Sequence, residues 1–232
     1  MNKQKILEKV LEVYQTCNIS SFPVDCLDLI SKCGIPCKSY SSLSRKKQEH
    51  CLLVSEEAFT LKNEIYYNDN LLDKRIRFSL IHELGHIILN HRENRSEAEE
   101  REANFFATNL LAPRVVIHYS ECKNHVDIIK RFDLSEEAAG YAFSDYKYWL
   151  RKAKLHFLDI DTLIYQHFFN AETNQLVWSI SDCECCFFPL AYNGSKVCPS
   201  CFIANLKKNR LNYNDQEYAL DLLRSQKLYG DI

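Results

Sequence analysis

The sequence predicts an α+β fold, with helices around a small mixed sheet and a small cysteine-rich segment at the C-terminal end. Apolar residues recur at helical spacing in residues 6–14 and again in residues 77–91. Short apolar or aromatic runs at 35–40, 51–54 and 64–67 are typical of strands, and the charged residues 45–49 of a solvated loop. Near residue 158 the composition changes, and five of the eleven cysteines lie between Cys183 and Cys201.

Composition and length indicate a soluble globular protein with one main domain and an appendage. The chain has 232 residues, of which 46% are hydrophobic and 26% charged. We expect a first domain at 1–157 and a second at 158–232. The net charge of −2 does not favour nucleic acid or a membrane as partner. With neither a signal sequence nor an apolar run of membrane-spanning length, we expect a cytoplasmic protein.

The central feature is the motif His82-Glu83-Leu84-Gly85-His86. Histidines four residues apart lie on the same helical face, so both can bind a single metal ion, and Glu83 beside them can act as a general base. The motif fixes only three residues, His82, Glu83 and His86, and such a pattern arises by chance in some chains. However, the apolar flanking residues predict a buried helix, in which a histidine or carboxylate needs a partner. Gly85 indicates close approach of another backbone or of substrate.

A second helix can supply a third ligand. Ser96 followed by Glu99 forms a capping box, which predicts a helix from about Glu97 to Leu111. We choose Glu100 as the metal ligand because it shares a helical face with Asn104, which can orient a ligand by hydrogen bonding. Glu99 and Glu102 remain alternatives, and some of these glutamates are explained by the helix dipole alone.

The elements before the motif helix indicate where a peptide would bind. Residues 64–67 are expected to form a strand, and Asn70 to begin the motif helix. If the strand has an exposed edge near Ile65 to Tyr67, an extended peptide can pair with it through main-chain hydrogen bonds.

Several blocks together resemble the ImmA/IrrE family of metallo-endopeptidases. They are residues 21–25 with Gly34-Ile35, residues 77–86, and residues 100–113. The resemblance covers roughly residues 5–150 and implies a zincin-like metallopeptidase domain. The segment Glu100-x-x-x-Asn104 is similar to the Glu-x-x-x-Asp of gluzincin peptidases, which implies that Glu100 is the third zinc ligand. One departure is Ala112, where family members commonly carry Met.

The C-terminal cysteines have the spacing of a second metal site. Two Cys-x-x-Cys pairs flank an intervening hairpin, which is typical of a zinc ribbon held by four thiolates: Cys183, Cys186, Cys198 and Cys201. Cys185 is a spare that could replace a neighbour. Free thiols or a redox pair are the other interpretations. A closing helix is expected over 214–228.

We therefore expect a zinc-dependent endopeptidase with one catalytic and one structural zinc ion. His82, His86 and Glu100 would hold the catalytic ion, with Glu83 as general base. The resemblance implies that the substrate is a helix-turn-helix transcriptional repressor, often encoded nearby on a mobile element. His118, Tyr119 and His125 are candidates for stabilising the oxyanion.

The alternative function is a non-catalytic regulatory binding module, or the toxin-side partner of a two-gene pair. Direct nucleic-acid binding is not the favoured role, and the C-terminal segment is where it would occur.

Overall fold

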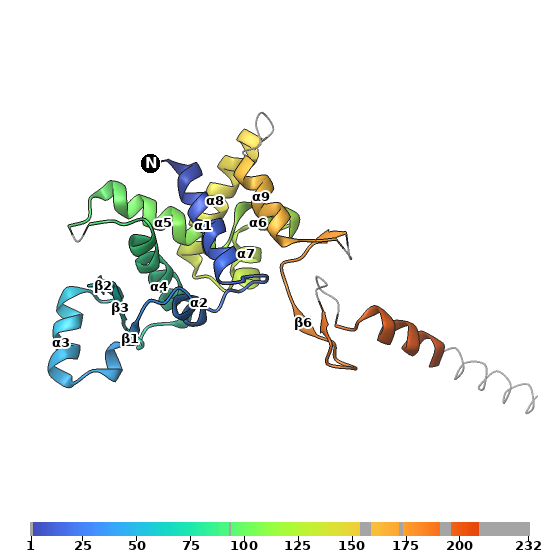
Figure 1. Cartoon of the computed structure of the whole chain (residues 1–232), viewed down its shortest axis with the longest axis horizontal. Helices are drawn as coiled ribbons and strands as arrows, with labels where there is room; N and C mark the ends of the chain where they lie inside the picture. The colour runs from blue at the N-terminus through green and yellow to red at the C-terminus, as the bar shows by residue number, and fades with distance from the viewer. Residues whose placement is uncertain (1, 93, 154–158, 172–173, 191–195, 209–232) are drawn as a thin grey trace, which may run out of the picture. The chain divides into compact units, whose positions relative to one another are not determined.

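A computed structural model describes residues 2–92, 94–153, 159–171, 174–190 and 196–208 (Figure 1). The chain divides into two compact units, Met1–Ser179 and Ile180–Ile232. The first unit combines helices with a small mixed sheet, as the sequence predicts for an α+β domain. None of the described helices is both long and apolar enough to span a membrane.

The first unit begins with α1 (Lys3–Thr16), α2 (Cys26–Lys32) and α3 (Arg45–Val54). Its main sheet contains β1 (Cys37–Ser39), β2 (Ala58–Leu61) and β3 (Glu64–Tyr67). The motif helix α4 (Asp73–Ile88) and its neighbour α5 (Glu97–Leu111) follow. Further helices are α6 (Arg114–Tyr119), α7 (His125–Phe132), α8 (Glu136–Ala153) and α9 (Asp159–Phe168), and a short hairpin pairs β4 (Phe169–Asn170) with β5 (Gln175–Leu176).

The main sheet has the strand order β1-β3-β2, so β3 lies at its centre. β1 is parallel to β3 and β2 is antiparallel to it, with Thr60 opposite Ile65. The expectation of an exposed edge at Ile65 to Tyr67 is therefore wrong, because both edges of β3 are already paired. Among the described residues, the strand with an unpaired outer edge beside α4 is β2.

Residues 45–54 form a helix and not the predicted loop and strand. The charged residues at its start are good helix formers, and the backbone N–H groups of Lys47 and Gln48 donate to the Ser44 carbonyl. The apolar residues at its end are exposed, with Leu53 at 83%. Helix propensity and local hydrogen bonds thus determine the secondary structure of this segment. The strand prediction for residues 51–54 requires the apolar run to be buried, but most of it is exposed.

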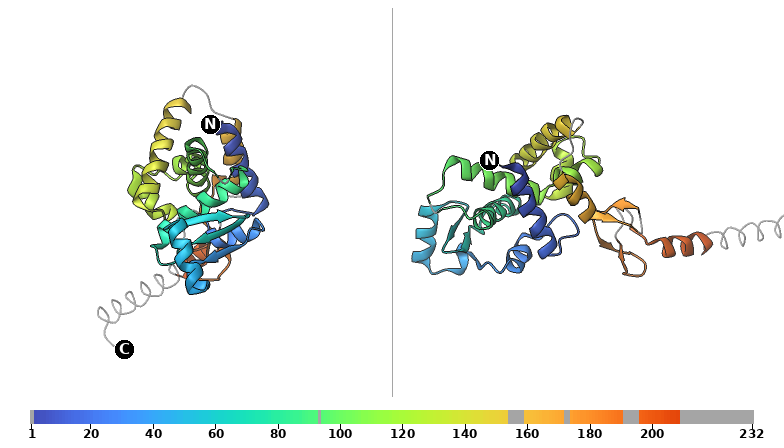
Figure 2. Two further views of the ribbon diagram at one scale, coloured as in Figure 1. Left: turned by 90° about the vertical axis from the view of Figure 1, so that its left-hand side faces the viewer. Right: turned by 45° about the horizontal axis from the view of Figure 1, so that its top comes forward.

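Helices α4 and α5 lie side by side, with β2 and β3 also packed on α4 (Figure 2). α4 begins at Asp73 with Leu72 as its N-cap, later than the predicted start at Asn70, because Asn68 and Asn70 form a local turn instead. α5 has the predicted capping box of Ser96 and Glu99. The fully buried Tyr14 also ties α1 to α5 by donating to the carbonyls of Asn109 and Leu110.

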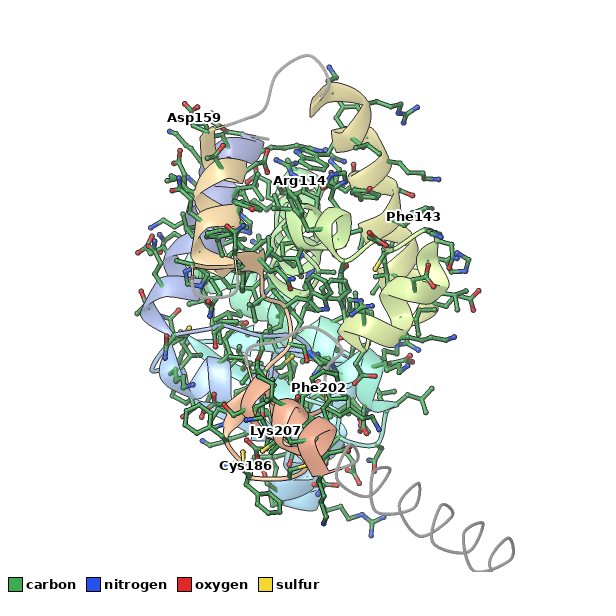
Figure 3. The ribbon with its side chains drawn as sticks, turned by 90° about the vertical axis from the view of Figure 1, so that its right-hand side faces the viewer. Arg114, Phe143, Asp159, Cys186, Phe202 and Lys207 are labelled. Carbon is green, nitrogen blue, oxygen red and sulfur yellow. The ribbon has the colours of Figure 1, made fainter. Side chains whose placement is uncertain are left out.

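The first unit extends past the predicted boundary at residue 157. Arg114 on α6, which is labelled in Figure 3, forms a buried bidentate ion pair with Asp161 on α9, at 2.9 and 3.1 Å. Trp149 on α8 donates to the same carboxylate. Ile160, Ile164 and Phe168 also belong to the core. Because α9 completes this core, the division between units falls after Ser179.

The second unit contains a hairpin of β6 (Ser181–Asp182) and β7 (Pro189–Leu190), followed by a helix over residues 199–208. The expected closing helix at 214–228 lies outside the described residues.

Gly85 controls the distance between α4 and α5. A Cβ atom at this position would lie 2.9 Å from Cδ1 of the fully buried Phe106 and 3.4 Å from the Ala103 carbonyl oxygen. The close approach predicted from Gly85 is therefore confirmed, with a neighbouring helix as the partner.

Gly85→Ala should lower the free energy of unfolding by about 1–2 kcal/mol, although alanine is the better helix former. Phe106 is fully buried, so its ring would have to shift within a packed core, and we expect this cost to exceed the gain of about 1 kcal/mol in helix propensity. Urea unfolding followed by tryptophan fluorescence measures the change. Gly140→Ala is the matched control, because nothing lies within 4 Å of a Cβ there. An equal stabilisation by both substitutions would contradict the packing argument.

Candidate metal centre and active site

Side chains from α4 and α5 converge on one point. His82 and His86 lie one turn apart on α4, and Glu100 lies in the first turn of α5. The Nε2 atoms of the two histidines are 3.0 Å apart, and Glu100 oxygens lie 3.1 Å from His82 Nε2 and 3.6 Å from His86 Nε2. The structure thus brings together the three residues that the sequence nominates as ligands.

These separations fit a tetrahedral zinc ion. Nitrogen and oxygen ligands bind Zn²⁺ at about 2.0–2.1 Å, which places neighbouring ligand atoms roughly 3.3 Å apart. The three observed distances lie on either side of this value. Two imidazoles and one carboxylate leave a fourth position open, which is the arrangement of a catalytic zinc site.

Each histidine is oriented through its other ring nitrogen. His82 Nδ1 lies 2.9 Å from Oδ1 of Asn104, the residue that the sequence predicts for this purpose. His86 Nδ1 lies 3.0 Å from His91 Nδ1, and His91 Nε2 lies 3.4 Å from a Glu102 oxygen. If Nε2 of each ligand faces a metal, its Nδ1 carries the proton and donates outward.

The charge state of His86 also suits metal binding. Burial, together with the nearby charges of Arg95, His82 and His91, lowers the pKa of His86 to about 3. The ring is therefore neutral near pH 7 and keeps the lone pair that a metal ion requires.

Glu83 is buried next to this group and its carboxylate is fully oriented. Arg95 donates two hydrogen bonds to it, at 3.0 Å to Oε1 and 2.7 Å to Oε2. Thr60 on β2 adds a third, at 2.7 Å to Oε2. An ionised carboxylate accepts about four hydrogen bonds, so one acceptor position remains, on Oε1.

The alternative ligands Glu99 and Glu102 contact other residues, Ser96 and His91. The backbone N–H and hydroxyl groups of Ser96 lower the pKa of Glu99 to about 2, and both groups lie 2.8 Å from the same Glu99 oxygen. Glu102 faces His91. Of the three acidic candidates, only Glu100 lies among the histidine Nε2 atoms.

The described contacts of the oxyanion candidates lie away from the histidine–glutamate group. His118 lies 3.2 Å from the Tyr146 hydroxyl and packs on Tyr119 and Trp149. His125 is the first residue of α7.

Sequence reasoning missed Thr60, His91 and Arg95. These residues come from β2 and from the segment after α4, and they reach the site only through the tertiary fold. His91 carried a weak signal, since it follows the motif by five residues.

The second unit holds a group of four cysteines whose sulfurs can share one ion: Cys183, Cys186, Cys198 and Cys201. Cys186 Sγ lies 3.7 Å from Cys198 Sγ, close to the roughly 3.8 Å expected for thiolates bound to tetrahedral zinc at about 2.3 Å. The Cys198 backbone N–H donates to Cys183 Sγ at 3.3 Å and lowers the pKa of Cys183 to about 6, which favours the thiolate. Cys186, one of the four, is labelled in Figure 3. Cys185 is not part of the group; it is exposed and lies near Asn205.

A comparison with known protein families shows which family part of the chain resembles. Residues 39–144 match the family described as Peptidase_M78, the IrrE N-terminal-like domain. The matched range contains β2, α4 and α5, and thus every residue of the histidine–glutamate group. No curated protein is similar enough over its sequence to count as a relative.

His91→Ala should weaken metal binding at the histidine–glutamate group by about 10- to 100-fold, because His86 loses the group that orients its ring. Titration with Co²⁺ is a suitable measurement, since its visible spectrum distinguishes a nitrogen–oxygen site from a thiolate site. His50→Ala, an exposed histidine on α3, is the control. Unchanged Co²⁺ affinity in folded His91→Ala protein would show that the ring of His91 only fills space.

Proposed function

We propose that this chain, whose residues 39–144 form an IrrE N-terminal-like domain of a peptidase family, is a zinc-dependent endopeptidase. The observation that carries the proposal is the convergence of His82, His86 and Glu100 on one point, with the buried Glu83 beside it. A zinc ion bound there would polarise the scissile carbonyl and make a water molecule more acidic.

In this mechanism Glu83 is the general base. Its free acceptor position on Oε1 takes the proton of the attacking water, and the same carboxyl group then passes that proton to the leaving amine. Arg95 and Thr60 keep the carboxylate in one orientation throughout. This preorganisation lowers the entropy cost of bringing water and base together.

The substrate would lie in extended form along the outer edge of β2. This strand pairs only with β3 among the described elements, and its Thr60 touches the proposed base. Main-chain hydrogen bonds to such an edge accept many sequences and fix the register of a peptide. The edge proposed here replaces the one at β3, which is paired on both sides.

We further propose that the target is a helix-turn-helix repressor encoded near this protein, cleaved in an exposed segment to relieve repression. The fold and site support peptide-bond hydrolysis, and the family resemblance supports this class of target.

The four cysteines of the second unit would hold a structural zinc ion. The described residues of this unit include few buried apolar side chains, and a unit with a small core gains most of its folding free energy from such an ion. This zinc would stabilise the unit and take no part in hydrolysis.

A second candidate is a binding module that sequesters a regulator, or the toxin-side partner of a two-gene pair, with little turnover. The ion pair between Arg95 and Glu83 favours it, because Arg95 occupies an acceptor position on each carboxylate oxygen that a water molecule could otherwise use. If wild-type protein loaded with zinc binds the neighbouring regulator without cleaving it, this candidate is preferred.

Glu83→Gln should reduce cleavage of the neighbouring regulator by about 100-fold or more, because the amide cannot accept the proton. Mass spectrometry of timed digests, with equal zinc content in all samples, measures the rate and the cleavage site. Glu97→Gln is the matched control, since Glu97 on α5 is 93% exposed. Cleavage by Glu83→Gln at the wild-type rate would rule out this mechanism.

A further inference from the structure

A polar cavity of about 420 Å³ lies beside the proposed active site. Its walls come from β2 and the β2–β3 turn, from the C-terminal end of α4, and from the segment after it: Thr60, Lys62, Asn63, His86, Ile87, Asn90, His91, Arg92 and Arg95. The cavity therefore touches both a proposed zinc ligand and the strand along which a peptide would lie. The site described so far does not use this space.

The cavity is lined by positive and not by negative side chains among the described residues. Three cationic residues line it, namely Lys62, Arg92 and Arg95, and the described lining contains no carboxylate. Among the described residues, the side chains of Lys62 and Arg92 form no ion pair. Arg95 pairs with Glu83, which is not part of the cavity lining. Within the described part of the chain, these two positive charges therefore have no ion-pair partner, and they lie beside the edge proposed to bind a peptide.

The turn between β2 and β3 and the segment after α4 place these cations in the lining of the cavity. Lys62 and Asn63 occupy left-handed conformations, with φ of 49° and 60°, which make the tight turn between β2 and β3. Arg92 and Arg95 follow the end of α4, and Arg95 is held on Glu83 by two hydrogen bonds. Arg95 thus donates its two-point contact to Glu83, in the geometry that arginine prefers, so Lys62 and Arg92 are the cations that a further carboxylate would meet.

We propose that this cavity binds a carboxylate of the substrate, so that the enzyme prefers peptides with Asp or Glu close to the scissile bond. The inference rests on the proposed peptidase function and adds a specificity to it. A residue in an extended chain spans about 3.3 Å, and the cavity borders both His86 and Thr60. A side chain within about three residues of the bond can therefore reach it. The carboxylate could also be the C-terminus of a peptide.

The test uses full-length protein loaded with zinc and a set of internally quenched peptides that differ only by Glu or Gln at one position. One set has amidated C-termini and a second set has free C-termini. Wild-type protein should cleave the best Glu peptide about 10-fold more efficiently than its Gln partner, mainly through a lower KM, since the contact is made in the bound substrate as well as in the transition state. Preference in the amidated set identifies a side chain, and preference only for free ends identifies the terminal carboxylate.

The double variant Lys62→Glu with Arg92→Glu should lose or invert the preference for Glu over Gln. Lys46→Glu, a charge reversal at an exposed position of α3, is the control and should keep it. Equal cleavage of Glu and Gln peptides by wild-type protein, or a preference that survives the double variant, would overturn the inference while leaving the peptidase function intact. Failure to cleave any peptide or the neighbouring regulator would overturn both.

Discussion

The close contact of α4 with α5 at Gly85 is the constraint on which the site depends. Without a side chain at this position, Phe106 and the Ala103 carbonyl approach the α4 backbone. A Glu100 oxygen from α5 can then lie 3.1 Å from His82 Nε2 and another 3.6 Å from His86 Nε2 on α4, as zinc coordination requires. A wider spacing of the helices would move Glu100 away from both histidines. The apolar core behind the contact, including Leu84 and Phe106, keeps this spacing constant.

Burial of polar groups around that contact explains the remaining residues. His86 and Glu83 are nearly inaccessible, and buried polar groups must find partners. His91 and Arg95 supply them from the segment between α4 and α5, and Thr60 supplies one from β2. These partners determine which nitrogen of His86 faces the ligand group and how the carboxylate of Glu83 is turned. The same segment and strand line the cationic cavity, so the same residues support the proposed metal site, the proposed base and the proposed specificity site.

The sequence predicts the helices of this site, and the three residues that converge there, better than the elements around them. A spacing of four residues brings His82 and His86 together in any α-helix, and the capping box of Ser96 and Glu99 locates α5 and so Glu100. Strand order depends on contacts between distant segments, so the local sequence does not show that β3 is the central strand and that β2 lies at an edge. The apolar end of α3 resembles a buried strand in sequence, but the tertiary fold leaves it exposed on a helix. Arg95 could not be assigned for the same reason, since its partner is twelve residues earlier in the chain.

Zinc K-edge X-ray absorption tests the central claim most directly. In a variant with serine at Cys183, Cys186, Cys198 and Cys201, only the histidine–glutamate group can bind tightly. We predict about one zinc ion per chain with nitrogen and oxygen ligands at about 2.0–2.1 Å and no sulfur, and loss of this zinc when Glu100→Gln is added. A variant that retains no zinc, or a spectrum that Glu100→Gln leaves unchanged, would contradict the assignment of these three ligands.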